Sequence, residues 1–114
     1  MGLTSLRRLK QLLYHVQTKQ DLDSLGLKLP QIVQEELLRN TEYPDEGFAL
    51  IAENWEDISK ARSFIDYTIH PCEWVNRLDC GWLSALYVIN NGFTVTLLLP
   101  ADIAPDSLLR ELEE

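Results

Sequence analysis

Three residues of this 114-residue chain have side chains suited to metal or nucleophilic chemistry and lie near one another in the sequence: His70, Cys72 and Cys80. A structural zinc site normally takes four such ligands, commonly as two close pairs, and the second pair is missing here. His15 or Asp79 would complete a site only through an approach in the tertiary fold. We therefore predict no metal and no cofactor, and interpret the cysteines as small buried side chains.

A thiol-dependent enzyme would use the same residues, with Cys72 as nucleophile and His70 as base. The two residues are only two positions apart, so they would share one face of a strand and be poorly placed to form a catalytic pair. The sequence contains no G-x-S-x-G motif, no Gly-Lys-Ser/Thr phosphate loop and no Gly-rich dinucleotide fingerprint. We predict no catalytic residue. A small thiol- or metal-dependent enzyme using Cys72, Cys80 and His70 is the first alternative.

An acidic segment provides the candidate binding site. Between Glu42 and Asp57 the chain has six carboxylates and no Lys or Arg, and Tyr43 and Trp55 lie among them. Tyr and Trp are over-represented among the residues that dominate binding energy, so exposed aromatics among carboxylates would form a protein-binding patch. Such a segment is also typical of a solubilising edge whose acids complement a helix dipole. The candidate partner-binding residues are Glu42, Tyr43, Asp45, Glu46, Glu53, Trp55, Glu56 and Asp57.

The overall charge indicates the kind of partner. The formal net charge is −8, but residues 1–20 hold Arg7, Arg8, Lys10 and Lys19 with no acid, which leaves six basic against 18 acidic residues, or −12, in the remainder. Such a field repels nucleic acid phosphates and attracts basic protein surfaces. Three cations on one N-terminal helix are few for binding a membrane or nucleic acid. We predict a protein partner with a basic surface.

Length and composition predict one domain over residues 1–114, because 46% hydrophobic and 25% charged residues are ordinary for a globular chain of this size. No stretch approaches the roughly 20 apolar residues that cross a bilayer. The run Leu12-Leu13-Tyr14 is too short for the core of a secretion signal. We therefore expect a cytoplasmic protein with reduced thiols and no membrane contact.

The first half of the chain predicts helices. Leu6, Leu9, Leu13 and Val16 recur at helical spacing after a Thr4-Ser5 cap. Thr18 and Asp21 resemble a capping box for a short second helix that would stop at Gly26. A third helix would begin with Pro30 as its first residue and end near Asn40, with Val33 and Leu37 on its apolar face.

Strands and helices alternate in the second half. After a loop over 42–47, residues 48–53 predict a buried strand, and Asn54 caps a helix whose Trp55, Ile58, Ala61 and Ile65 would face the core. The segment 66–80 favours a strand, with a helix opened by Pro71 as the alternative. Residues 105–114 predict a closing helix with Leu108, Leu109 and Leu112 on its apolar side.

The strongest local signal is a β-hairpin at about residues 82–99, turning at Asn90-Asn91-Gly92. A two-residue Asn91-Gly92 loop would pair Val88 with Val95 and Leu86 with Leu97. A three-residue loop would mix the two faces, which we take as the less favourable register. The two-residue register puts one wholly apolar set on the first face: Trp82, Leu86, Val88, Val95, Leu97 and Leu99.

The second face of that hairpin would hold Tyr87, Thr94 and Thr96 together with Leu83, Ala85, Ile89 and Leu98, and is too apolar to lie fully in water. A helix, a symmetry mate or a partner must cover it. Helices followed by strands predict an α+β fold, with an antiparallel sheet centred on the C-terminal hairpin and packed against N-terminal and C-terminal helices.

The function that fits these features best is a small, acidic, non-enzymatic protein-binding domain. It would act as immunity proteins and inhibitors do, on a basic protein partner. The second alternative is a structural homo-oligomer, such as a homodimer formed through the second face of the hairpin.

Overall fold

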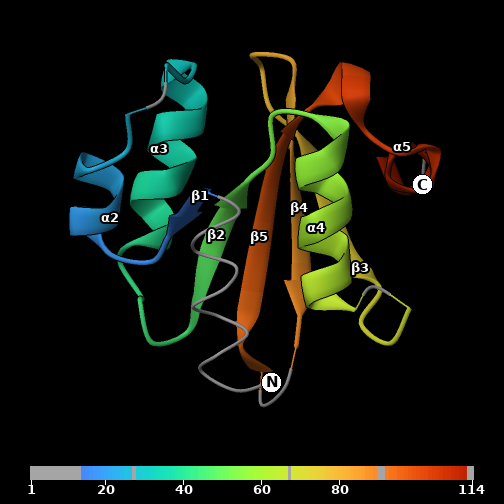
Figure 1. The fold of residues 1–114 in the computed structure, drawn as a ribbon, viewed down its shortest axis with the longest axis horizontal. Helices are drawn as coiled ribbons and strands as arrows, with labels where there is room; N and C mark the ends of the chain where they lie inside the picture. Colours follow the sequence, from blue (N-terminus) through green and yellow to red (C-terminus); the bar gives the residue numbers. More distant parts are fainter. Residues whose placement is uncertain (1–13, 27, 67, 90–91, 113–114) are drawn as a thin grey trace.

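The chain adopts an α+β fold with a five-stranded mixed sheet (Figure 1). The computed structural model describes residues 14–26, 28–66, 68–89 and 92–112. In chain order the elements are β1 (Tyr14–Val16), α2 (Lys19–Asp23), α3 (Gln31–Asn40), β2 (Gly47–Ile51), α4 (Trp55–Ile65), β3 (Cys72–Arg77), β4 (Trp82–Val88), β5 (Thr94–Pro100), a 3₁₀ turn (Ala101–Ile103) and α5 (Asp106–Leu112).

The strand order across the sheet is β1-β2-β5-β4-β3. β5 is therefore the central strand, and the hairpin of β4 and β5 lies in the middle of the sheet as predicted. β2 and β5 run parallel, whereas the other neighbours are antiparallel. The expectation of a purely antiparallel sheet is wrong because the chain leaves β2 through α4 and inserts β5 beside β2 only after building β3 and β4.

Helices lie on both faces of the sheet. We call the face under α4 the front and the face under α3 the back. The front cluster joins Ile58, Ala61 and Ile65 of α4 to alternate residues of the strands, including Leu50, Val95 and Leu97. The back cluster joins Val33 and Leu37 of α3 to Val16, Ala49, Ile51 and Leu98. Figure 1 shows α4 across the middle strands and α3 beside β1 and β2.

Side-chain caps mark the starts of α2 and α4. The Thr18 side chain accepts from the backbone of Asp21 and the Asp21 side chain accepts from the backbone of Thr18, so the predicted capping box forms. Asn54 caps α4 as predicted, by accepting from the Asp57 N–H. α2 ends earlier than predicted, with Ser24 as its right-handed C-cap in place of Gly26.

The third and last helices confirm their predicted ranges with small shifts. α3 ends at Asn40 as predicted, but Pro30 precedes the first helical residue instead of occupying that position. Val33 and Leu37 are buried as predicted. α5 spans Asp106–Leu112 within the predicted 105–114, and Leu108 is buried.

Two helix expectations are wrong. Tyr14–Val16 is a strand that pairs with β2, so the prediction that the first helix extends to Val16 is wrong. The part of that predicted helix before residue 14 lies outside the described residues. Trp55 is 59% exposed and not in the core. At 3.6 residues per turn, Trp55 lies about 90° around α4 from the mean direction of Ile58, Ala61 and Ile65, at the edge of their stripe. Those three are buried as predicted.

The hairpin register differs by one residue from the predicted one. Val88 pairs with Thr94 and Leu86 pairs with Thr96. The Ile89 N–H donates to the Phe93 carbonyl at 2.7 Å, which leaves three residues, 90–92, in the loop. Gly92 has φ of +78°, the left-handed conformation that closes three-residue hairpin loops. The two-residue loop is therefore wrong, and every side chain of β4 lies on the opposite face from the predicted one.

This shift exchanges the two faces of β4 relative to β5. Leu83, Ala85 and Tyr87 share the front face with Val95, Leu97 and Leu99, and all six are at most 1% exposed beneath α4. Trp82, Leu86 and Val88, predicted to lie in the core, lie on the back face and are half-buried. The strand favoured over 66–80 is present as β3, which pairs with β4.

Gly47 begins β2 and pairs in register with Thr94 of β5. A Cβ added at Gly47 would lie 2.2 Å from Thr94 Oγ1 and 2.3 Å from the Thr94 carbonyl oxygen. We expect Gly47→Ala to push the two strands apart and lower the free energy of unfolding by about 1–3 kcal/mol, as overpacking does. Gly26→Ala is the matched control, since nothing lies within 4 Å of a Cβ there. Urea unfolding measures both, and an unchanged midpoint for Gly47→Ala would contradict the expectation.

Asp21 predicts a pH dependence. Partial burial raises the pKa of Asp21, but hydrogen bonds from the backbone of Thr18 and Gln17 and the charge of His15 lower that pKa overall from 3.8. A lowered folded-state pKa means that the stabilisation is present above about pH 4 and is lost as the pH falls through the lowered value. We expect Asp21→Asn to cost about 0.5–1 kcal/mol at pH 7 and less than that near pH 2.

Thermal unfolding at the two pH values measures this difference. Asp23→Asn, a change at the exposed last residue of the same helix, is the matched control. An equal loss at both pH values for Asp21→Asn would show that the carboxylate charge does not matter.

Candidate functional site

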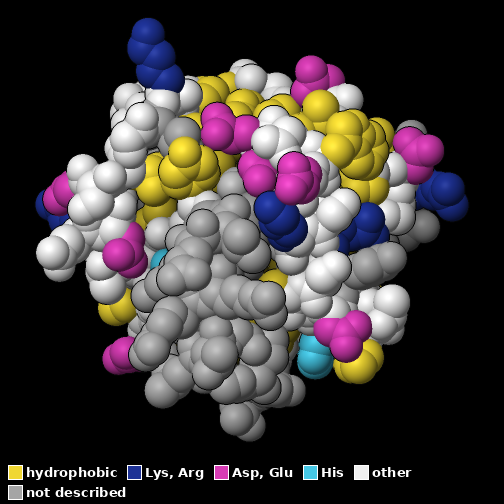
Figure 2. All heavy atoms as spheres, viewed as in Figure 1, with side chains coloured by type: hydrophobic (Ala, Val, Ile, Leu, Met, Phe, Trp, Pro, Cys, Tyr) yellow, Lys and Arg dark blue, Asp and Glu magenta, His cyan; other side chains and the backbone are white. Residues whose placement is uncertain are grey.

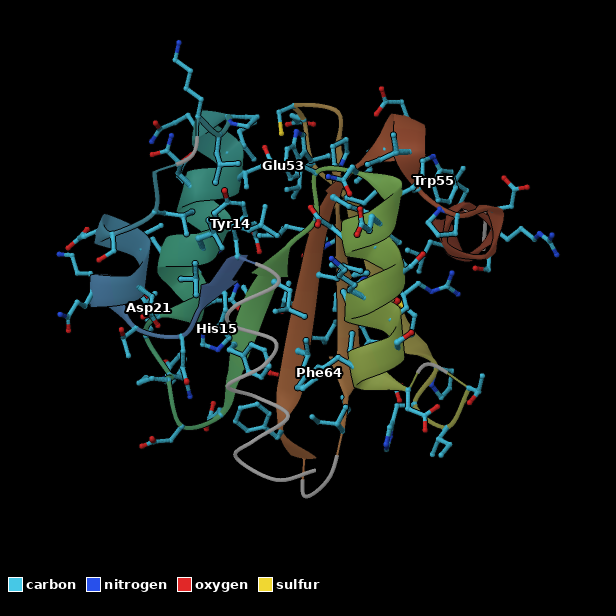
Figure 3. All side chains as sticks on the ribbon, in the orientation of Figure 1. Tyr14, His15, Asp21, Glu53, Trp55 and Phe64 are labelled. Atoms are coloured by element: carbon cyan, nitrogen blue, oxygen red, sulfur yellow. The ribbon has the colours of Figure 1, made fainter. Side chains whose placement is uncertain are left out.

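The eight candidate residues fall into two patches at opposite ends of β2. Glu42, Tyr43, Asp45 and Glu46 precede the strand, and we call them the Tyr43 patch; Glu53, Trp55, Glu56 and Asp57 follow it, and we call them the Trp55 patch. Five strand residues at about 3.3 Å each put roughly 15–20 Å between them. Figure 3 shows Glu53 and Trp55 at the end of the sheet where α4 begins, on opposite sides of the first turn of that helix.

The Tyr43 patch is a loop between α3 and β2. The Glu46 N–H donates to the Tyr43 carbonyl at 3.0 Å, and the Glu46 carbonyl accepts from the Thr94 N–H at 2.9 Å and from Thr94 Oγ1 at 3.2 Å. These bonds tie the loop to the start of β5. Tyr43 is nevertheless 62% exposed, so a fixed loop presents its ring to solvent.

A cleft of about 180 Å³ opens beside this loop. Its cation, Arg39, pairs with Glu36 one turn earlier on α3, so it does not offset the patch acids. Among the described residues, Glu42, Asp45 and Glu46 take part in no ion pair. The cleft therefore joins the exposed ring of Tyr43 to one carboxylate, that of Glu46. Its lining residues are Arg39, Asn40, Tyr43, Glu46, Gly47 and Thr94.

The carboxylates of the Trp55 patch also act within α4. Asp57 accepts from the Glu53 N–H at 3.2 Å, while its own N–H donates to Asn54 Oδ1 at 2.9 Å. Glu56 pairs with Lys60 at 3.1 Å. Figure 2 shows acidic side chains gathered over the start of α4 with hydrophobic side chains beside them. Asp57 and Glu56 thus help to form the helix, whereas the side chains of Trp55 and Glu53 are exposed.

The residues considered for thiol or metal chemistry are separated. Cys72 begins β3 and Cys80 lies in the turn after β3, so roughly 15 Å of strand separates them, too far for a disulfide or one metal ion. Cys72 Sγ donates to the carbonyls of Trp74 at 3.3 Å and Leu86 at 3.6 Å. Within the ranges that the structure describes, no three His, Cys, Asp or Glu side chains are close enough to hold a metal.

Two further expectations concern membranes and the basic N-terminus. Arg7, Arg8 and Lys10 lie outside the described residues, and Lys19 is exposed at the start of α2. In the described part of the chain, the helices are too short or too polar to cross a bilayer.

Sequence reasoning missed two exposed aromatic residues, Tyr14 of β1, which is 42% exposed, and Trp74. Trp74 on β3 is 63% exposed and pairs with Leu86, which places it on the back face. The face on which Trp74 lies is set by the pairing of β3 with β4, whose register shifts between Cys72 and Trp74, and no local pattern in the sequence indicates that shift.

Comparison of the chain with protein-family models, with curated proteins and with solved structures finds no match. The arrangement of residues therefore carries the functional argument.

The exposure of Trp55 leads to a stability prediction. Because the ring is mostly in solvent, we expect Trp55→Ala to change the free energy of unfolding by less than about 0.5 kcal/mol. Ile58, one turn later on α4, is 1% exposed, and Ile58→Ala should cost about 2–5 kcal/mol. Chemical denaturation compares them. A loss above about 2 kcal/mol for Trp55→Ala would mean that the ring packs in the core, as first predicted.

Proposed function

We propose that this chain is a small, acidic, non-enzymatic protein-binding domain that docks on a basic protein surface, as inhibitors and immunity proteins do. The observation that carries the proposal is the exposure of Tyr43 within a tethered loop whose three acids have no ion-pair partner among the described residues. A ring held on a fixed loop loses little conformational freedom on binding, and the carboxylates favour a cationic partner.

The Tyr43 patch is the primary contact in this proposal, and the Trp55 patch is a secondary one. Two features favour that order. Tyr43 and Glu46 of the Tyr43 patch line a cleft. In the Trp55 patch, by contrast, Asp57 takes part in the helix cap and Glu56 forms an ion pair with Lys60. The chain's net charge of −8 adds a long-range attraction that would speed the encounter with a basic partner and weaken with salt.

Charge reversal tests this mechanism. Affinity capture at low salt first isolates the partner. Replacing Glu42, Asp45 and Glu46 by Lys should then reduce the affinity at least about tenfold at low salt, and by less at high salt, because screening shortens the reach of the charges. Glu53→Lys with Glu56→Lys should have a smaller effect. Surface plasmon resonance at two salt concentrations measures association rates and affinities.

A second triple variant separates the local patch from the overall field. It makes the same change in net charge at exposed acids outside both patches, and its substitutions are Asp23→Lys, Glu35→Lys and Asp79→Lys. We expect this control to lower the association rate modestly and to leave the dissociation rate unchanged. The proposal fails if no partner is retained at low salt, or if the patch variant and this control behave alike.

A further inference from the structure

The back of the sheet is covered over only part of its width. α3 lies against β2, and its residues Val33 and Leu37 pack on Ala49, Ile51 and Leu98. Neither buried cluster of the described residues includes Trp74, Leu86 or Val88, which share the back face further along the sheet. Leu86 and Val88 are half-buried and Trp74 is 63% exposed. We call these three residues, with Ser84 next to Leu86 on the same face of β4, the open back face.

The open back face is continuous with the cleft of the Tyr43 patch. Val88 pairs with Thr94, and Thr94 lines that cleft beside Tyr43. One surface therefore runs from Trp74 on β3 across β4 to Tyr43, and it has a strongly exposed aromatic ring at each end. Aromatic anchors around a half-apolar floor are typical of the centre of a protein interface.

Strand and helix spacings indicate where a helix docked on this face would lie. β4 lies two strands from β2 in the order β2-β5-β4, which at about 4.8 Å per strand is roughly 10 Å. Helices packed side by side have their axes about 8–10 Å apart. Because α3 lies over β2, a neighbouring helix at that spacing would lie over β4, where Leu86 and Val88 face outward.

Charge selects among the occupants of this face. Glu42, Asp45 and Glu46 lie at the Tyr43 end, while Arg39 is paired with Glu36 and Arg77 of β3 pairs in register with Leu83 of the front face. A second copy of the chain would bring another net charge of −8 against these acids. A segment with Lys or Arg beside its apolar stripe would neutralise them.

We propose that the open back face is the docking site for an amphipathic, basic helix of the partner protein. The helix lies beside α3 over β4, with its apolar stripe on Trp74, Leu86 and Val88 and its cations toward the Tyr43 patch. This rests on the proposed protein-binding function and names the form of the partner segment.

A designed peptide tests this site directly. The probe is a fluorescein-labelled helix of about 14 residues, with Leu along one stripe and Lys elsewhere, and its binding to the full chain is followed by fluorescence anisotropy. We expect Trp74→Ala to weaken binding about tenfold or more. Trp55→Ala removes an equally exposed ring from the front side of the molecule and should leave the affinity unchanged, since the two rings are 63% and 59% exposed.

Two control peptides test the chemistry of the occupant. The same peptide with Glu in place of Lys, and one with two central prolines that prevent a helix, should each bind at least about tenfold more weakly. Equal binding of the proline peptide would overturn the helical form. Equal effects of Trp74→Ala and Trp55→Ala would overturn the site.

Light scattering tests the competing occupant. If the chain is a dimer that Trp74→Ala converts to a monomer, a second copy covers the face and the proposal is wrong.

The captured partner separates failure of this site from failure of the proposed function. If reversal of the Tyr43-patch acids weakens partner binding and Trp74→Ala does not, the function stands and this site fails. If Trp74→Ala weakens binding and the charge reversals do not, the site stands and the acidic mechanism fails.

Discussion

β5 pairs with β2 along one edge and with β4 along the other, and its residues from Val95 to Leu99 are buried between α4 in front and α3 behind. A strand that is hydrogen-bonded on both edges and dry on both faces can carry an unbroken apolar run, which would be insoluble at an edge. This central position requires β2 to approach so closely that only glycine fits at residue 47. It also places the two acidic segments at opposite ends of β2 and leaves β1 and β3 as edges.

Features that depend on neighbouring residues were predictable from the sequence. Thr18 with Asp21 and Asn54 with Asp57 form side-chain caps whose partners lie three residues away, so the tertiary fold is not needed to identify them. The burial of Ile58, Ala61 and Ile65 follows from their helical spacing, and the existence of the hairpin follows from two apolar runs around Asn91-Gly92. The exposure of Tyr43 and Trp55 required the structure, because an aromatic residue is equally common in a core.

Features that depend on register or on distant pairing were not predictable in the same way. Both loop lengths give one mainly apolar hairpin face, and Ser84 is the residue that distinguishes them. The two-residue loop would place Ser84 opposite Leu99 in the front core, whereas the three-residue loop pairs it with Leu98 and leaves it half-exposed on the back. The parallel pairing of β2 with β5 joins segments more than 40 residues apart, and no local pattern indicates it. The acidic run looks continuous in sequence, but β2 passes through its middle.

The two faces of the sheet differ in composition because they differ in cover. A strand face that meets only water usually carries residues such as Ser84 and Thr94, and a covered face carries residues such as Leu83 and Val95. Trp74, Leu86 and Val88 have the apolar side chains of a covered face but are partly or mostly exposed to solvent. Exposed apolar surface of this kind is typical of protein interaction sites. A net charge of −8 opposes the pairing of two copies through this surface, because like-charged copies repel each other. The same charge would favour a cationic segment over every neutral or acidic competitor for that face.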